Sequence, residues 1–119
     1  MIPRLIKLIK SKKIKELGEI YKQNISGDFS HAEDICNGLY KLVISKVYFN
    51  NLIFSSNKKT YINDIIKFLL KKNNIQKNFI KSNIKNNLTP IGDNTFTKKI
   101  LKWKIKKDIF VAADELNKL

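Results

Sequence analysis

The spacing of apolar residues along the chain predicts three helices. The clearest lies in residues 60–72, where the apolar residues fall on one face and Thr60 is placed to cap the first turn. These apolar residues are Ile62, Ile65, Ile66, Leu69 and Leu70. Residues 12–23 show the same spacing, and a final helix is expected to begin after Asp108, whose side chain can cap it. Residues 4–9 fit either a strand or a first helical turn.

The richest run of β-branched and aromatic residues lies in residues 41–55. It is interrupted by Asn50 and Asn51, and asparagine tolerates the left-handed backbone conformation that a two-residue hairpin turn needs. We therefore predict a β-hairpin over 41–55. A Ser-x-x-Glu capping box predicts a short helix before it, over about 31–36. One continuous helix over 31–54 is the alternative.

Residues 99–105 alternate between apolar side chains and lysine. This period of two predicts a half-buried strand whose outer face carries Lys102 and Lys104. Trp103, between these lysines, could stack on a nucleobase, but its position in an alternating strand favours packing in the core. Residues 75–87 fit either a helix or a strand.

Together these elements predict one α+β domain over residues 1–119. The length of 119 residues is usual for a single domain, and no repeat or low-complexity linker divides the chain. We expect a small, mostly antiparallel sheet with two main helices packed on one face. The hydrophobic fraction of 43% excludes a fully disordered chain. No stretch approaches the roughly 20 apolar residues that a membrane-spanning helix needs.

The charge of the chain narrows its possible partners. The sequence has 24 lysine and arginine residues against 10 acidic residues, which gives a net charge of +14. Such a charge repels itself and is best tolerated beside an anionic partner, of which nucleic acid is the commonest and a membrane surface the second. Only Arg4 is an arginine. Lysine suits phosphate neutralisation better than base reading, although an AT-rich genome would also enrich lysine, asparagine and isoleucine.

Residues that could carry catalysis are few. His31 is the only histidine and Cys36 the only cysteine, and their spacing matches no catalytic pair or metal site. We expect His31 to be exposed in the first turn of a helix, and Cys36 to be a small buried side chain in a reducing compartment. The four glycines stand apart, so they form no phosphate-binding loop. The chain is expected to be no enzyme and to need no cofactor, metal or small-molecule substrate.

Lysines gather in three clusters along the chain. The clusters span residues 10–15, 58–77 and 98–107. Few acidic residues balance them, which favours a polyanion-binding surface over charge that serves solubility alone. Lys58 and Lys77 in the second cluster are candidate RNA contacts. Strand periodicity adds Lys102, Lys104 and Lys106 in the third.

The segment Tyr61–Ile75, YINDIIKFLLKKNNI, resembles a helix of a known family. That helix has the form Y-L-x-Y-L-T-K-K-Y-L-K-K-N-x-L, and the family is the eukaryotic "e" family of large-subunit ribosomal protein L-twenty-two. The predicted hairpin resembles the strand pair that precedes this helix in the family, and residues 99–105 resemble its last strand. The family's Asp-Trp pair after the helix and its acidic C-terminal tail have no counterpart here.

The resemblance implies a structural constituent of the large, 60S-type subunit of a cytoplasmic ribosome. Its partners would be ribosomal RNA and neighbouring ribosomal proteins, with no membrane involved. The lysines that the resemblance places against RNA are Lys59, Lys67, Lys71 and Lys72.

Two other functions remain open. A winged-helix DNA-binding regulator would need a helix over 75–86, after the helix at 61–71, and a wing over 99–105. A subunit of another nucleoprotein assembly would be helical throughout, with almost no β-structure. Secondary structure over 75–86 distinguishes the first of these from the ribosomal family, because that family has a strand there.

Overall fold

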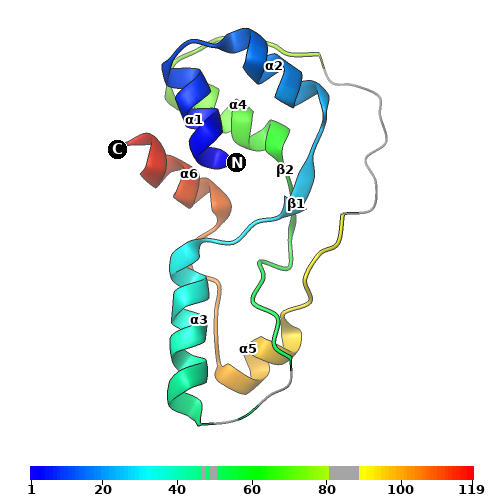
Figure 1. The fold of residues 1–119 in the computed structure, drawn as a ribbon, viewed down its shortest axis with the longest axis vertical. Helices are drawn as coiled ribbons and strands as arrows, with labels where there is room; N and C mark the ends of the chain where they lie inside the picture. The colour runs from blue at the N-terminus through cyan, green and yellow to red at the C-terminus, as the bar shows by residue number, and fades with distance from the viewer. Residues whose placement is uncertain (47, 49–50, 81–88) are drawn as a thin grey trace.

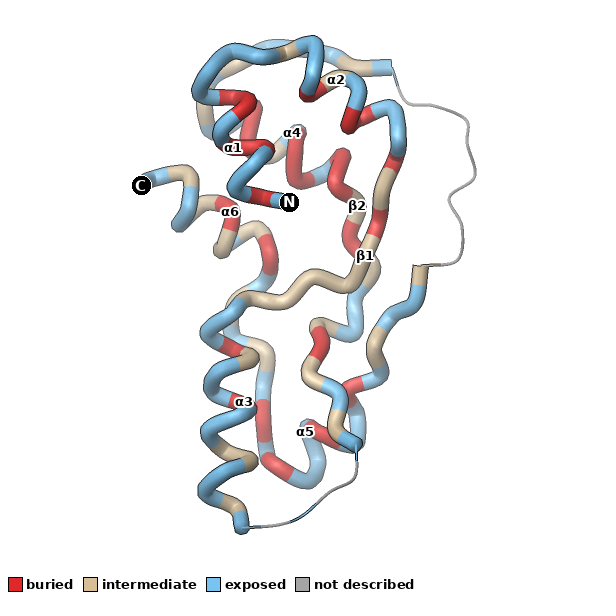
Figure 2. Tube along the Cα trace, viewed as in Figure 1, coloured by how far each residue is buried: buried red, intermediate tan, exposed pale blue. Residues whose placement is uncertain are grey.

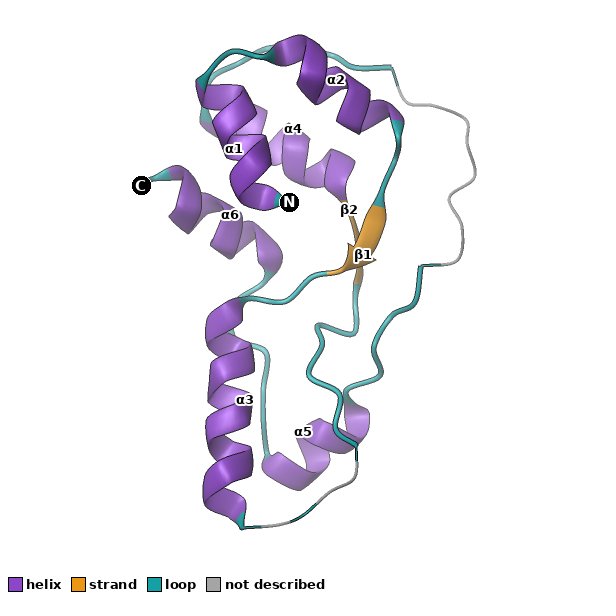
Figure 3. Ribbon diagram, viewed as in Figure 1, coloured by secondary structure: helices purple, strands orange, loops and turns teal. Residues whose placement is uncertain are grey.

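Six helices and two short strands form in the part of the chain that the computed structural model describes, which is residues 1–46, 48, 51–80 and 89–119. The helices are α1 (Ile2–Lys10), α2 (Ile14–Lys22), α3 (Ala32–Ser45), α4 (Ile62–Lys72), α5 (Thr95–Leu101) and α6 (Ile109–Asn117). The strands β1 (Ser26–Asp28) and β2 (Lys59–Tyr61) pair antiparallel, with Gly27 opposite Thr60 (Figure 3). The predicted α+β class is confirmed, although the sheet is a small part of the fold.

The helices divide between two lobes along the 50 Å axis of the molecule (Figure 1). The core lobe contains α1, α2, α4 and α6. The α3 lobe contains α3, α5 and the non-helical residues 51–58 and 102–107. Helices of the core lobe pack on one another rather than on one face of a sheet, because two strands of three residues offer too little apolar surface. The predicted small antiparallel sheet is present, and the described residues form six helices where we expected two main ones.

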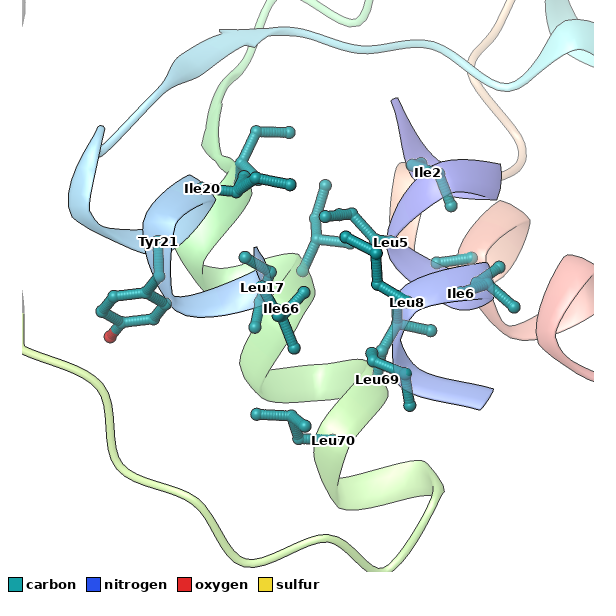
Figure 4. Packing of buried hydrophobic residues seen from close by; sticks show 14 of the residues in the cluster. Ile2, Leu5, Ile6, Leu8, Leu17, Ile20, Tyr21, Ile66, Leu69 and Leu70 are labelled. Carbon is teal, nitrogen blue, oxygen red and sulfur yellow. The ribbon is translucent and has the colours of Figure 1, made fainter. Parts of the chain in front are cut away.

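Apolar side chains that α1, α2 and α4 turn toward one another hold the core lobe together (Figure 4). Leu5, Leu17 and Ile66 have no exposed surface, and each forfeits about 1.5–3 kcal/mol if it is left in water. The predicted apolar stripe of α4 is buried along its whole length. Tyr61 rather than Thr60 occupies the N-cap position of α4. The final helix is capped as predicted, since the Asp108 side chain accepts two backbone hydrogen bonds from its first turn.

The hairpin predicted over 41–55 is wrong. Its first five residues belong to α3, and residues 51–58 form no strand. The alternative of a long helix is right as far as Ser45, after which Lys46 adopts the left-handed conformation with φ 54°. The predicted turn at Asn50 lies outside the described residues. High β-propensity does not make this segment a strand, because it reflects packing of side chains against a neighbouring strand. Val43 and Ile44 instead face solvent on α3.

The strand predicted over 99–105 is also wrong, because α5 continues to Leu101 and the following residues pair with no strand in the described structure. The alternation is nevertheless present in burial (Figure 2). Leu101 and Trp103 are buried, whereas Lys102 and Lys104 are exposed. A non-helical chain with one side against α3 produces this pattern without a ladder of backbone hydrogen bonds.

Residues 75–80 form neither a helix nor a strand, although the sequence of 75–87 fits either. They follow α4 as an irregular segment, after Asn74 has adopted the left-handed conformation with φ 55°. Phe79 packs its ring against Tyr21 of α2, with the ring centroids 5.3 Å apart. The remainder of 75–87, beyond Ile80, lies outside the described residues.

A buried carboxylate, that of Asp34, holds residues 103–107 against α3. Asp34 is 1% exposed, and its Oδ2 accepts hydrogen bonds from the backbone N–H groups of Lys106 and Lys107 at 3.0 and 2.9 Å. The backbone carbonyl of Asp34 accepts a third hydrogen bond, from Nε1–H of Trp103 at 2.7 Å. Gly38 follows one turn later, where a Cβ would collide with the Phe54 ring. Asp34 therefore binds the segment 103–107, and Gly38 leaves room for Phe54 beside the same helix.

Asp34→Ala should destabilise the protein by about 3 kcal/mol or more, because it removes the buried, charged acceptor of two part-buried backbone hydrogen bonds. Urea unfolding followed by the fluorescence of Trp103 measures the loss. Asp64→Ala, at an exposed position in the first turn of α4, is the control and should cost less than about 1 kcal/mol. Equal losses for the two variants would contradict the role of Asp34.

Candidate nucleic-acid interface

The lysines predicted to contact RNA lie at the surface but do not form one continuous row. They are Lys58, Lys59, Lys67, Lys71, Lys72, Lys77, Lys102, Lys104 and Lys106. Lys59 is half-buried, and the others are exposed. Lys58 directly precedes β2 and Lys59 begins it, near the junction of the two lobes. Most of the others line two separate depressions, one in each lobe.

The α4 depression lies on the outer side of the core lobe and has a volume of about 590 Å³. Lys67 and Lys71, one turn apart, line it because the apolar stripe of α4 faces the core and leaves them on the solvent side. Lys77 lines the same depression from the irregular segment after α4, together with Gln76 and Asn78. The structure thus brings together three of the predicted lysines and two amide side chains.

Lys72 differs from its neighbours because it binds α6. Its Nζ lies 3.2 Å from the Asp114 carboxylate and 5.4 Å from the centroid of the Phe68 ring. Asp114 also pairs with Lys118 at 2.7 Å. Hydrogen bonds from Lys118, and then from Lys72, hold the pKa of the Asp114 carboxyl below its ordinary value. Lys72 is therefore less available to an external phosphate than Lys67 or Lys71.

The α3 groove is the second basic depression, with a volume of about 380 Å³ between α3 and the segment after α5. It is lined by Asn37, Tyr40, Lys41, Ile44, Lys102, Trp103, Lys104 and Lys106. Lys41 Nζ joins the two walls by donating a hydrogen bond to the carbonyl of Lys102 at 2.9 Å. The segment after α5 runs beside α3 (Figure 1). Its three exposed lysines therefore border the same groove.

Trp103 forms the inner wall of the α3 groove and is not available for stacking. Its side chain is 1% exposed, and its ring meets Phe54 edge to face with centroids 5.4 Å apart. Packing in the core was the favoured interpretation of this tryptophan, and it is confirmed. The exposed ring is that of Tyr40, at 66%.

Sequence reasoning missed the α3 side of this groove because the hairpin prediction began at residue 41. The signal was present in the helical alternative. Asn37, Tyr40, Lys41 and Ile44 have the spacing i, i+3, i+4, i+7, which places them on one face of a helix. A helix through this region therefore places all four on one mixed polar and aromatic face, whereas a hairpin from residue 41 would put Lys41 and Ile44 on opposite sides of a sheet.

His31 joins α3 to α6 and is not the exposed residue that we expected. Its side chain is 11% exposed; Nδ1 accepts the backbone N–H of Glu33, and Nε2 lies 2.9 Å from Glu115. Because Nδ1 is an acceptor, the neutral ring carries its proton on Nε2 and donates it to Glu115. His31 replaces Ser30 of the predicted capping box as the N-cap of α3.

An exposed ion-pair cluster surrounds this histidine. Lys107 Nζ lies 2.7 Å from Glu33 and 2.9 Å from Glu115, and both contacts raise the pKa of Lys107 above its ordinary value. Lys107, and then His31, lower the pKa of Glu115. Cys36, one turn after the cap, is exposed rather than buried, because the outer face of α3 is open to solvent.

Other kinds of site find no support in the described residues. No three histidine, cysteine or acidic side chains there come together as metal ligands could. Within the same residues, no helix has the length and apolar character needed to cross a membrane.

No family model matches the chain, and no curated protein or solved structure is significantly similar to it. The resemblance to the ribosomal family therefore depends on the sequence of residues 61–75. The strand pair and the last strand that would extend it are not found, since residues 41–45 and 99–101 are helical.

Glu115→Gln should reduce the loss of stability in acid. A carboxyl group whose folded pKa lies below the ordinary 4.5 stabilises the fold above pH 4.5 and loses that contribution as pH falls through the folded pKa. The drop in the thermal unfolding midpoint between about pH 6 and about pH 3 should therefore be smaller for Glu115→Gln than for wild type. Glu16→Gln, on the exposed face of α2, is the control. An unchanged drop in Glu115→Gln would show that this cluster does not stabilise the fold.

Proposed function

We propose that the protein is a non-catalytic subunit of a ribonucleoprotein assembly and binds RNA through lysine–phosphate contacts. The observation that carries this proposal is the pair of lysine-lined depressions in a chain of net charge +14. The lysines concerned are Lys67, Lys71, Lys77, Lys102, Lys104 and Lys106. Each is exposed, and none forms an ion pair with another described residue.

Phosphate neutralisation suits these side chains energetically. An exposed ammonium group reaches a phosphate without first leaving a buried position or breaking an internal ion pair. Each neutralised phosphate also releases condensed counterions, which is the main source of affinity in sequence-independent binding. The molecule extends over 50 × 34 × 16 Å, so lysines in its two lobes can reach phosphates that are far apart on a folded RNA.

The resemblance at residues 61–75 makes the large subunit of a cytoplasmic ribosome the first assembly to test, with ribosomal RNA and ribosomal proteins as partners. The small extent of β-structure supports a second candidate, a subunit of another nucleoprotein assembly, because the two strands of the described residues comprise only three residues each. A winged-helix regulator has less support. Residues 75–80 contain no helix, and residues 99–101 belong to α5 rather than to a β-wing.

Affinity for a structured RNA should fall steeply and linearly on a log–log plot against salt concentration, by roughly 0.7 to 0.9 units per neutralised phosphate. Fluorescence anisotropy with a labelled ribosomal RNA hairpin measures this slope. Replacing Lys67 and Lys71 by alanine should lower the slope by about 1.5. Lys72→Ala is the control and should lower the slope by less than the roughly 0.7 to 0.9 expected of one phosphate-binding lysine, since Lys72 already pairs with Asp114. A flat salt dependence in wild type would contradict the proposal.

The ribosomal assignment has its own test in the cells that make the protein. Tagged wild-type protein should sediment with the large subunit in a high-salt sucrose gradient, whereas a Lys67→Glu, Lys71→Glu double variant should remain near the top. The wild-type protein and the double variant should unfold at similar temperatures, because substitutions at exposed positions cost little stability. Wild type at the top of the gradient would refute ribosomal association. Equal sedimentation of the two would show that α4 is not the RNA-binding face.

A further inference from the structure

We infer that the α3 groove binds an unpaired nucleotide, with its base stacked on Tyr40 and the flanking phosphates on Lys102, Lys104 and Lys106. This inference depends on the proposed function and specifies which part of an RNA the groove recognises. The α3 groove would thus bind a single-stranded segment of RNA. The α4 depression would bind backbone phosphates of single-stranded or duplex RNA alike.

Tyr40 has the exposure and the rigid support that a stacking platform needs. Tyr40 is 66% exposed, and the groove that it lines is walled by the buried Trp103. The side of α3 next to the groove is fixed, because Asp34 binds the backbone of residues 106–107 and Gly38 lies against Phe54. A ring held on an anchored helix loses little conformational freedom when a base stacks on it, and such stacking tolerates any base.

The lysines beside this ring are arranged along one side of a non-helical segment. Trp103 is buried and Ile105 half-buried, so Lys102, Lys104 and Lys106 are the exposed members of an alternating series. Lys102 has a left-handed backbone conformation with φ 49°, and Lys104 and Lys106 follow it on the same wall, so the three ammonium groups can meet phosphates that flank a bound base. Positive charge and an aromatic face within one groove are the two features that single-strand binding sites combine.

The remaining walls suit a nucleobase. The groove volume of about 380 Å³ lies within the range of small-molecule sites. Ile44 offers apolar surface, and the Asn37 amide offers both a donor and an acceptor for the edge of a base. A base inside a duplex has both faces covered by its neighbours, so it cannot reach Tyr40. The groove should therefore distinguish unpaired from paired RNA.

Fluorescence anisotropy with two labelled RNAs, a 15-nucleotide oligo(U) and a blunt duplex of the same length, tests this inference on the full chain. Tyr40→Ala should weaken oligo(U) binding by about 5- to 150-fold, which corresponds to about 1–3 kcal/mol for one stacked base. Its affinity for the duplex should change less than about twofold. Tyr40→Phe keeps the ring and should bind oligo(U) like wild type.

Val43→Ala is the matched control, because Val43 is 76% exposed on the same helix but does not line the groove. It should bind both RNAs like wild type. If Tyr40→Ala leaves oligo(U) binding unchanged, or weakens both RNAs equally, the stacking site is refuted while the RNA-binding proposal survives. If wild type binds neither RNA, the proposed function itself fails. A preference for oligo(dT) over oligo(U), measured in parallel, would overturn the assignment to RNA.

Discussion

The hydrogen bonds that the buried Asp34 carboxylate accepts from the amides of Lys106 and Lys107 are the contact on which the α3 lobe depends. This lobe has no large apolar core, since the main cluster of buried apolar side chains contains no residue of α3 or α5. A second carboxylate, that of Asp28, likewise accepts backbone N–H groups from Ser56 and Gly92. Charge-assisted hydrogen bonds to the backbone thus stabilise the α3 lobe, whereas apolar packing stabilises the core lobe.

This use of acidic residues also determines where positive charge remains. Asp28 and Asp34 turn inward to backbone donors, and Glu33, Asp114 and Glu115 pair with lysines near α6. None of the five other acidic residues forms an ion pair with the lysines of the α4 depression or the α3 groove among the described residues. The same arrangement that stabilises the α3 lobe therefore concentrates unpaired lysine where an anionic polymer can reach it.

Local signals allowed the sequence to predict α4 and the Asp108 cap of α6, because an apolar stripe and a capping side chain act over a few residues. The segment 41–55 could not be predicted in this way. Its β-branched and aromatic composition favours a strand only where a neighbouring strand packs against it, and α3 has no such neighbour in the described structure. The contact of Asp34 spans 72 and 73 residues of chain, so nothing near it in the sequence indicates it. Tyr40 was missed because a hairpin predicted from residue 41 hid the helical face to which it belongs, and because the other wall of the groove begins at Lys102, 61 residues after Lys41.

A titration of ¹⁵N-labelled protein with oligo(U), followed by amide chemical shifts, tests most directly whether the Asp34-supported groove is a binding site. The account predicts the largest shift changes at Tyr40, Lys41 and residues 102–106, with smaller changes beside Lys67 and Lys71. Amides of α1, on the far side of the core-lobe packing from the α4 lysines, should barely move. Changes concentrated on α1 and α2, with the amides of the α3 groove unmoved, would contradict it.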